Sequence, residues 1–493
     1  MSSPLDASAD RHFDAIVIGG GIAGLAAAWE FTRAGLRPLI LEARGYLGGQ
    51  IAALDIAGAR IDIGAESFAP RGTAVSSMAA ELGLEVVAPE GGRASLFLPP
   101  LDPSGDAPWA LHPFPPASLM GIPSDPGLPA VAAILGDEGV KRAQEDRRLP
   151  ADAGGERPDL ASFVEARMGR AVVDRLVRPI VAGIHSADPA DLDADRVVPG
   201  LRAATLAAGS LSAAVEEILA RSPGPRGDVG IRGGMGALVE TLREAILRAG
   251  GAVLTRTGAR TLSRTGEGWR VEAAPVRPAA APWAEPVPAG EPVELRARRI
   301  VLAAAPAAAR RLLAALVPEA ESLDPPRGAP IVRSFLAVRA PGLDDAPVGP
   351  GLLVSPDAGC PVRAKALSQL DVKWPWVAEA LRAAHGPGAH LLRLSHGRPG
   401  DEDREPALEE LLDEALALTG VRIGGECVLA HRVIHWNGTL AQAAPALRER
   451  IDAVRGAAEA MEGLAVTGAW VAGSGVSAVV ADARSRAVRL LGE

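Results

Sequence analysis

The feature that most constrains the fold is a short apolar strand that runs directly into a glycine-rich turn. Residues 15–18 (Ala-Ile-Val-Ile) lead into the pattern Gly19-x-Gly21-x-x-Gly24, which is followed by apolar side chains at helical spacing and by a second strand at residues 38–41. Strand, glycine turn, helix and strand in this order predict a βαβ unit that opens a Rossmann-type α/β sheet.

Each position of this motif has a physical reason if the ligand is a dinucleotide. Gly19 permits the tight turn, Gly21 lets the backbone approach a pyrophosphate, and Gly24 allows helix and strand to pack closely. The helix N-terminus at Ile22 and Ala23 offers free N–H groups and a partial positive charge to the phosphates. Glycines also serve bare turns, but a strand before them and a helix after them favour dinucleotide binding.

An acid at the end of the second strand narrows the choice of dinucleotide. Glu42 can accept hydrogen bonds from ribose hydroxyls, and it would repel the 2′-phosphate of NADP. Two more glycine-bearing turns follow, which let the backbone approach a flat ring without a side-chain clash. Their residues are Gly48-Gly49-Gln50 and Asp62-Ile63-Gly64-Ala65-Glu66-Ser67-Phe68. The alternative for Gly48-Gly49 is an ordinary loop.

With this succession of an acid, a double glycine and a glycine-rich turn, the sequence resembles the amine oxidase-type flavoproteins. The resemblance implies FAD, with Glu42 and Ala43 at the adenosine and Ala259 at a position where the family commonly has a valine against the adenine. It places the second turn along the ribityl chain and the isoalloxazine, through Gly49, Gln50, Gly64, Ala65, Glu66 and Ser67. Cys427 lacks the Ser-Gly-Gly context of a flavin tether, so the FAD is expected to be non-covalent.

The C-terminal segment resembles the other end of the same flavin site. Thr467-Gly468-Ala469-Trp470 leads through a second glycine turn into a final helix. The resemblance implies that Gly475, Val476 and Ser477 aim this helix N-terminus at the flavin pyrimidine, where its dipole would stabilise negative charge. A surface helix with a glycine-rich approach is the alternative.

The middle of the chain is similar to the porphyrinogen oxidases of haem biosynthesis. The similar segments are Leu111-His112-Pro113-Phe114-Pro115, Met120-Gly121-Ile122-Pro123-Ser124, Asp159 to Phe163 with Arg167-x-Gly169, Leu176 to Pro189, Gly233-Gly234-Met235, and Trp436 with Gln442. The resemblance implies an oxidase that converts coproporphyrinogen III to coproporphyrin III, passes hydride to flavin N5 and is reoxidised by O2 to give H2O2. Protoporphyrinogen IX oxidase is the nearest alternative. A flavin amine oxidase, a carotenoid desaturase and a non-catalytic flavin-binding paralogue are more distant ones.

The resemblance also assigns residues around the substrate. Gly183 matches a glycine whose backbone lies near the reacting meso carbon, and a simple turn glycine is the alternative. Arg71 and Arg178 are expected to face propionates, because an Arg–carboxylate contact is charge-assisted. A solvated Arg71 and an Arg178 that satisfies its own helix are the competing interpretations. Trp436 is expected to cover the flavin edge, or else to pack in a core.

The periodicities and the resemblance together predict three parts. Residues 12–88, 228–312 and 455–493 are expected to form a glutathione reductase-like FAD-binding domain from discontinuous segments. Residues 89–227 are expected to form a helical subdomain, with loops and short helices in its Pro- and Gly-rich first half. Residues 313–454 are expected to form a mixed α+β substrate domain.

Composition excludes several other classes. The 51 basic and 60 acidic residues give a net charge of −9, which argues against nucleic acid as a partner. Two cysteines and the pair His431 and His435 show no metal-ligand spacing, so no metal is expected. No signal peptide and no long uncharged apolar run is visible, which predicts a soluble cytoplasmic protein. Peripheral membrane contact and transfer of product to a ferrochelatase stay open.

Overall fold

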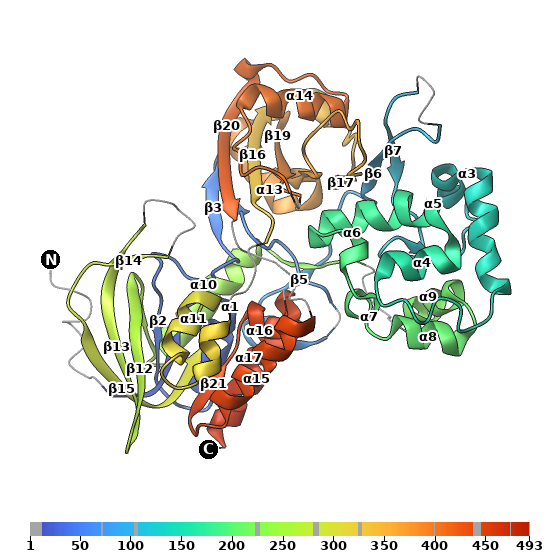
Figure 1. Cartoon of the computed structure of the whole chain (residues 1–493). Coiled ribbons are helices and arrows are strands. Elements are labelled where there is room, and N and C mark those ends of the chain that lie inside the picture. The colour runs from blue at the N-terminus through green and yellow to red at the C-terminus, as the bar shows by residue number, and fades with distance from the viewer. Residues whose placement is uncertain are drawn as a thin grey trace.

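The computed structural model describes residues 12–70, 72–102, 107–221, 227–279, 285–323, 328–398, 400–436, 445–473 and 475–492. These segments form a mixed α/β fold with several sheets. Figure 1 shows three parts: a large sheet with its helices at the lower left, a second sheet at the top, and a cluster of helices at the right.

The first sheet has eight strands and begins with the βαβ unit predicted from the glycine motif. Strand β1 pairs in parallel with β2, with Ile16 opposite Leu39, and helix α1 (Ile22–Arg33) connects the two strands. The order is β11-β2-β1-β15-β13-β12, with β14 beside β13 and β21 beside β15. The strands are β1 (His12–Ile18), β2 (Pro38–Leu41), β11 (Ala252–Leu254), β12 (Thr257–Thr265), β13 (Gly268–Arg277), β14 (Val287–Pro288), β15 (Val293–Leu302) and β21 (Leu464–Val466).

Alternate residues of β1 point to opposite faces of this sheet, as a strand requires. Ala15 and Val17 lie in one core, which contains helices from both ends of the chain. These helices are α1, α2 (Ala74–Glu81), α10 (Met235–Arg248) and α17 (Val476–Leu491). Ile16 and Ile18 lie in a second core on the opposite face, together with β12, β13, α11 (Pro306–Leu313) and α15 (Pro445–Glu459). The sheet is therefore buried on both faces.

The second sheet has seven strands in the order β20-β16-β19-β18-β17-β6-β7. Its strands are β6 (Ser95–Leu98), β7 (Ala110–Pro113), β16 (Ile331–Arg339), β17 (Gly351–Val354), β18 (Ala366–Gln369), β19 (Ala389–His396) and β20 (Val428–Trp436). Helix α14 (Leu408–Thr419) covers one face. The other face is covered by α13 (Pro375–His385) and by the hairpin of β3 (Ala53–Ile56) and β4 (Ala59–Asp62).

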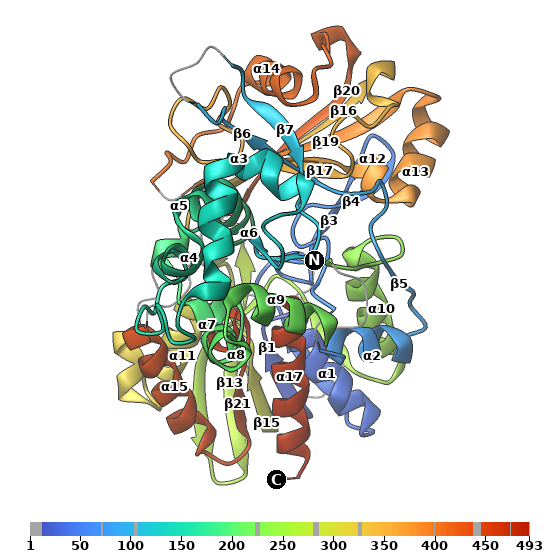
Figure 2. The same cartoon turned by 90° about the vertical axis from the view of Figure 1, so that its right-hand side faces the viewer.

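The third part is a helical cluster, shown beside the first and second sheets in Figure 2. Its helices share one apolar core. Its main helices are α3 (Pro129–Gln144), α4 (Leu160–Met168), α6 (Arg178–His185), α7 (Ala194–Val197), α8 (Leu201–Ala208) and α9 (Leu211–Ala220). Residues 160–177 and 201–219 show helical periodicity in the sequence and are largely helical here, and Gly169 (φ +87°) and Gly209 (φ +81°) each divide their stretch into shorter helices.

A fully buried ion pair and a helix cap give structural roles to two residues of the quoted segments, Arg167 and Asp159. Arg167 Nε lies 2.7 Å from an Asp146 carboxylate oxygen, and neither side chain has exposed surface. Asp146 also accepts hydrogen bonds from the backbone N–H groups of Leu211 and Ser212 at 3.1 and 2.8 Å. Arg167 at the end of α4 is thereby tied to the start of α9. At the other end of α4, the Asp159 carboxylate caps the helix.

The structure corrects three of the expected boundaries. Residues 95–98 and 110–113 were assigned to the helical subdomain, but they are strands β6 and β7 of the second sheet. The β3–β4 hairpin was assigned to the first domain, but it packs on the second sheet. Residues 313–323 and the whole of α15 belong to the core of the first sheet. The physical reason is the same each time. Each element packs against partners that are distant in the sequence, and local composition does not show which partners these are.

Among the described residues, no single helix is long and apolar enough to cross a membrane. Only α8 and α9 taken together reach that length and composition, and they are bent by 108°.

The contact between α1 and β1 generates a first prediction. A Cβ at Gly24 would lie 1.9 Å from the Gly19 carbonyl oxygen, so Gly24→Ala must push the helix away from the strand. We expect the free energy of unfolding to fall by about 1–3 kcal/mol or more, as for other overpacked cores, and thermal denaturation would measure this change. Gly456→Ala is the matched control, because Gly456 lies in α15 with no atom within 4 Å of an added Cβ. It should stabilise by about 0.5–1 kcal/mol. Equal stability of the two variants would contradict the steric argument.

Candidate functional site

The loop between β1 and α1 has almost no room for side chains. Gly19 has φ of +110°, and a Cβ there would come within 2.6 Å of the Ala303 carbonyl oxygen. Gly24 permits the close helix–strand contact described above. Gly21 differs, because φ is −69° and the nearest atom to an added Cβ would be the Gly49 Cα at 3.9 Å. The backbone at Gly21 is thus open on the side of the second glycine turn.

Glu42 lies against this loop at the end of β2. One carboxylate oxygen accepts a hydrogen bond from the Gly20 N–H at 2.7 Å and the other from the Arg44 N–H at 2.6 Å. The residue is 9% exposed, and burial raises the pKa of its carboxyl group against the effect of these hydrogen bonds. Each oxygen keeps a second lone pair, so the carboxylate can still accept from a ligand hydroxyl.

The residues expected around an adenosine lie together. The Thr257 N–H donates to the Glu42 carbonyl oxygen at 2.9 Å, which joins β12 to the end of β2. A Cβ on Gly258 would stand 3.8 Å from the Ala43 Cβ. Ala259 follows in the same strand and is buried. Glu42, Ala43 and Ala259 therefore occupy one region, and their contact with an adenosine stays a prediction.

Backbone hydrogen bonds join the first glycine loop to the later turns. The Gly48 N–H donates to the Gly20 carbonyl oxygen at 2.8 Å, and Gly21 and Gly48 form an isolated parallel bridge. The Ala65 N–H donates to the Gln50 carbonyl oxygen at 2.9 Å. A Cβ at Gly64 would stand 1.8 Å from that same oxygen, so only glycine fits there. Three separate sequence motifs thus form one continuous backbone surface.

Trp436 reaches this surface from the second sheet. It ends β20, and its indole Nε1–H donates to the Ile63 carbonyl oxygen at 2.8 Å. A Cβ on Gly64 would lie 3.3 Å from the ring atom Cζ2. The indole therefore lies against the turn at 63–64 and also packs on the core of the second sheet, and its role at a flavin edge stays a prediction.

The last helix also converges on the site. Gly475 precedes α17, and the Ser477 hydroxyl donates to the Ala69 carbonyl oxygen at 2.7 Å. The start of α17, including Val476, therefore lies just beyond Ser67 at the end of the second turn. The neighbouring Ser474 lies outside the described residues.

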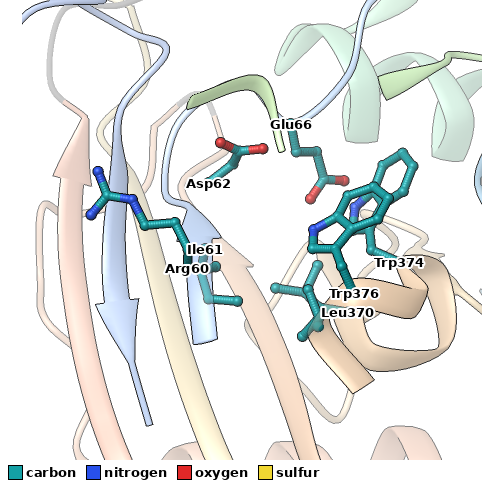
Figure 3. A pocket seen from close by; sticks show the side chains of 8 residues that line it. Arg60, Ile61, Asp62, Glu66, Leu370, Trp374 and Trp376 are labelled. Atoms are coloured by element: carbon teal, nitrogen blue, oxygen red, sulfur yellow. The ribbon is translucent and has the colours of Figure 1, made fainter. Parts of the chain in front are cut away.

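Asp62 has a role that the sequence reasoning missed. Its carboxylate accepts hydrogen bonds from the N–H groups of Met235 at 2.7 Å and Gly236 at 2.9 Å, so it caps α10. Burial raises its pKa to about 6. The Gly233-Gly234-Met235 turn was a visible signal, but nothing local showed that its partner was Asp62. Figure 3 shows this carboxylate in a small pocket with Glu66, Trp374 and Trp376.

Glu66 has partners that were also missed. Its side chain is 10% exposed and forms ion pairs with Lys373 and Arg393, on the second sheet and its covering helices. Burial alone would raise the pKa of Glu66, but Arg393 and Lys373 hold it well below its usual range. Because the carboxylate is engaged in this way, Glu66 can offer a cofactor its backbone rather than its side chain.

The expected substrate residues are placed less favourably. Arg178 forms ion pairs with Asp174 and, at 3.2 Å, with Asp188. Its charge is therefore already compensated, which favours a structural role over a substrate contact. Gly183 lies in α6, and a Cβ there would be 2.7 Å from a Leu353 methyl carbon, so it sits where α6 meets β17. Arg71 and Gln442 lie outside the described residues, and the expected role of Arg71 stays a prediction.

Residues 22–491 match the family model described as "Flavin containing amine oxidoreductase". The chain belongs to the flavin-containing amine oxidoreductase family. Its site is consistent with that description, because the joined glycine turns form a cradle that a Cβ at Gly19, Gly24 or Gly64 would disrupt. The residues present therefore fit a dinucleotide flavin.

Known relatives narrow the position within this family. Proteins named coproporphyrinogen III oxidase from Mycobacterium bovis and Mycobacterium tuberculosis are 30% identical, over 96% of this chain and 96% of theirs. The Mycobacterium leprae protein of that name is 28% identical over 96% of this chain and 97% of its own. These full-length matches confirm the resemblance to the porphyrinogen oxidases.

Solved structures of lower identity show the fold. An Exiguobacterium sp. 255-15 protein provisionally named a protoporphyrinogen oxidase superposes with a TM-score of 0.76, at 23% identity over 98% of this chain and 100% of the other. Putrescine oxidase with bound putrescine superposes with a TM-score of 0.61, at 16% identity over 98% and 99%. The fold is therefore that of the amine oxidase-type flavoproteins.

The Glu66 ion pairs generate a second prediction. Glu66→Gln leaves Lys373 and Arg393 in a buried site without their counter-charge. We therefore expect the free energy of unfolding, measured by chemical denaturation, to fall by about 3–5 kcal/mol. The matched control is Glu138→Gln, because Glu138 pairs with Lys141 on the exposed surface of α3 and should leave the midpoint unchanged.

The pH dependence of this loss follows from the pKa of Glu66. A carboxyl group whose pKa is lowered by folding stabilises the fold at pH values above its usual pKa of 4.5. That stability disappears as the pH falls below 4.5, so the wild type and Glu66→Gln should become more alike in acid. A difference that is constant from pH 7 to pH 3 would show that the ion pairs do not cause the stabilisation.

Proposed function

We propose that this protein is an oxygen-dependent coproporphyrinogen III oxidase that holds FAD without a covalent bond. The observation that carries the proposal is the single backbone surface formed by three glycine motifs within residues 19–68. Glu42 lies at one end of this surface, and α17, from the far end of the sequence, lies at the other. The full-length similarity to proteins named coproporphyrinogen III oxidase supports the choice of substrate.

The roles proposed for the cradle follow its geometry from one end to the other. The turn into α1 would hold the pyrophosphate, and Glu42, Ala43 and Ala259 the adenosine. The second turn and Trp436 would hold the ribityl chain and the ring, with the start of α17 beyond them. The residues in the proposed contacts are Gly19, Gly21, Ile22, Ala23, Gly24, Glu42, Ala43, Gly49, Gln50, Gly64, Ala65, Glu66, Ser67, Ala259, Trp436, Gly475, Val476 and Ser477.

Both cysteines lie in a different part of the molecule from this cradle. Cys360 and Cys427 are free thiols that pack against the α14 side of the second sheet. The second turn and Trp436 pack on the opposite face of that sheet. This placement supports a flavin held only by non-covalent contacts.

When bound, FAD would supply the redox chemistry, which is the two-electron oxidation of the substrate with dioxygen as the final acceptor and hydrogen peroxide as its product. The protein has to position the substrate and exclude water. Trp436 and the Glu66 ion pairs would fix the second turn from the side of the second sheet. Helix α6, with Gly183 at its contact with β17, would border the substrate on the side of the helical cluster.

The test is a paired oxidation assay with the purified protein. Coproporphyrinogen III should bleach the flavin without oxygen, and air should restore the colour while porphyrin fluorescence rises above autoxidation. Gly24→Ala should bind less flavin and lose activity in proportion, whereas Gly456→Ala should match the wild type.

Two results would overturn parts of this proposal. If protoporphyrinogen IX is turned over faster than coproporphyrinogen III, the proposed substrate is wrong, and the true substrate carries two fewer propionates. A correctly folded wild-type protein that stays colourless after incubation with FAD would overturn the proposed cofactor, and with it the activity.

A further inference from the structure

Lys365 is a buried cation without a counter-ion. It is 5% exposed, and it immediately precedes β18. Its ammonium group donates hydrogen bonds to the Ser186 hydroxyl at 2.5 Å and to the Gly397 carbonyl oxygen at 3.0 Å. Both acceptors are neutral, and no ion pair joins Lys365 to any described carboxylate. A buried charge of this kind is expensive, because it has lost its hydration without gaining a partner of opposite sign.

The other two lysines of the chain show the usual arrangement. Lys141 pairs with Glu138 at 2.8 Å on the surface, and Lys373 pairs with Glu66. Among the three lysines, Lys365 is therefore the most deeply buried, and it has only neutral partners.

A second cation near Lys365 makes its position still less favourable. The guanidinium of Arg333 on β16 donates to the carbonyl oxygens of Ile63, at 3.3 Å, and Gly64. Arg333 likewise forms no ion pair with a carboxylate in the described part of the chain. Burial, together with Arg333 and Arg398, lowers the pKa of Lys365 to about 8, and only Asp401 opposes this. Arg333 has Glu66 and Asp62 within electrostatic reach, whereas the ammonium group of Lys365 has only Asp401 to oppose its burial.

The two cations connect the cradle to the helical cluster. Arg333 contacts the second turn at Gly64, whereas Lys365 contacts Ser186 at the end of α6. Ser186 is the residue in left-handed conformation (φ +51°) at which α6 ends, three residues after Gly183. Gly183 faces Leu353, which pairs with Ala366, the residue next to Lys365. Lys365 thus lies where α6 meets the second sheet, at the helix proposed above to border the substrate.

We propose that Lys365 binds a carboxylate arm of the tetrapyrrole substrate, in a positive field to which Arg333 contributes. This inference rests on the function proposed above and identifies a residue that would select substrates by their acid groups. An incoming carboxylate would provide the missing counter-charge and form a charge-assisted hydrogen bond. Lys365 would then take the role that was expected of Arg178, whose charge is already compensated by Asp174 and Asp188.

The competing interpretation is structural: Lys365 would only hold Ser186 and Gly397 together. The two interpretations predict opposite effects on the substrate-free protein. Removing a purely structural lysine breaks two buried hydrogen bonds and lowers stability. If the charge of Lys365 is uncompensated until substrate binds, removing it also removes the free-energy cost of burying that charge. The thermal stability of the substrate-free protein should then stay equal or rise, while substrate binding is lost.

The experiment compares Lys365→Met with Lys141→Met, which makes the same change at an exposed, ion-paired lysine. Flavin content, the thermal midpoint, and the dissociation constants of coproporphyrin III and its tetramethyl ester are measured for both flavoproteins. KM and kcat for coproporphyrinogen III are measured in parallel. Lys365→Gln keeps a hydrogen-bond donor but loses the charge, and it replaces Lys365→Met if the methionine variant does not fold.

We expect Lys365→Met to retain its flavin and its thermal midpoint. It should bind coproporphyrin III about 10- to 100-fold more weakly, the effect of losing one charge-assisted contact. KM should rise more than kcat falls, and binding of the tetramethyl ester should change little. Lys141→Met should match the wild type in every measurement.

The outcomes separate this inference from the proposed function. If the wild type oxidises coproporphyrinogen III but Lys365→Met binds the free acid equally well, the role of Lys365 is wrong and the proposed function stands. A lower midpoint with equal loss of acid and ester binding would establish the structural role instead. A wild-type flavoprotein that neither binds coproporphyrin III nor oxidises its porphyrinogen would overturn both claims.

Discussion

The structure depends on one backbone contact, between the loop after β1 and the first turn of α1. A Cβ at Gly24 would lie 1.9 Å from the Gly19 carbonyl oxygen, so this close approach exists only because Gly24 has no side chain. This contact fixes the N-terminus of α1 at the edge of the sheet where β2 ends and Glu42 follows. The hydrogen bond from Gly20 to Glu42 and the bond from Gly48 to Gly20 then extend the same surface toward the second turn.

The first sheet and most of the cradle could be predicted because their signals are local. The βαβ unit lies within residues 12–41, and its apolar alternation and glycine spacing can be recognised without knowledge of any distant partner. The later glycine turns were located by resemblance, and the hydrogen bonds between them explain why they occur together.

The second sheet and the charge pairs could not be predicted, because they depend on distant partners. Strand β6 has four residues and is sorted into its sheet by β17, which lies much later in the chain. Glu66 was expected to touch a cofactor, whereas its carboxylate is held by Lys373 and Arg393. Arg178 was expected to face a substrate, yet two nearby aspartates compensate it. A charged residue type identifies a side chain that needs a partner, but only the three-dimensional fold shows which partner it finds.

The first sheet is assembled from both ends of the polypeptide, and this has a consequence during translation. The βαβ unit leaves the ribosome early, but β21 and α17, which complete the same sheet and core, follow only after residue 463. At about 5–20 residues per second, the apolar side of the early unit waits roughly 20–90 s for its cover. The apolar face of the first-made segment therefore stays without its final cover during most of translation, and the nucleotide cradle can close only after translation has passed α17.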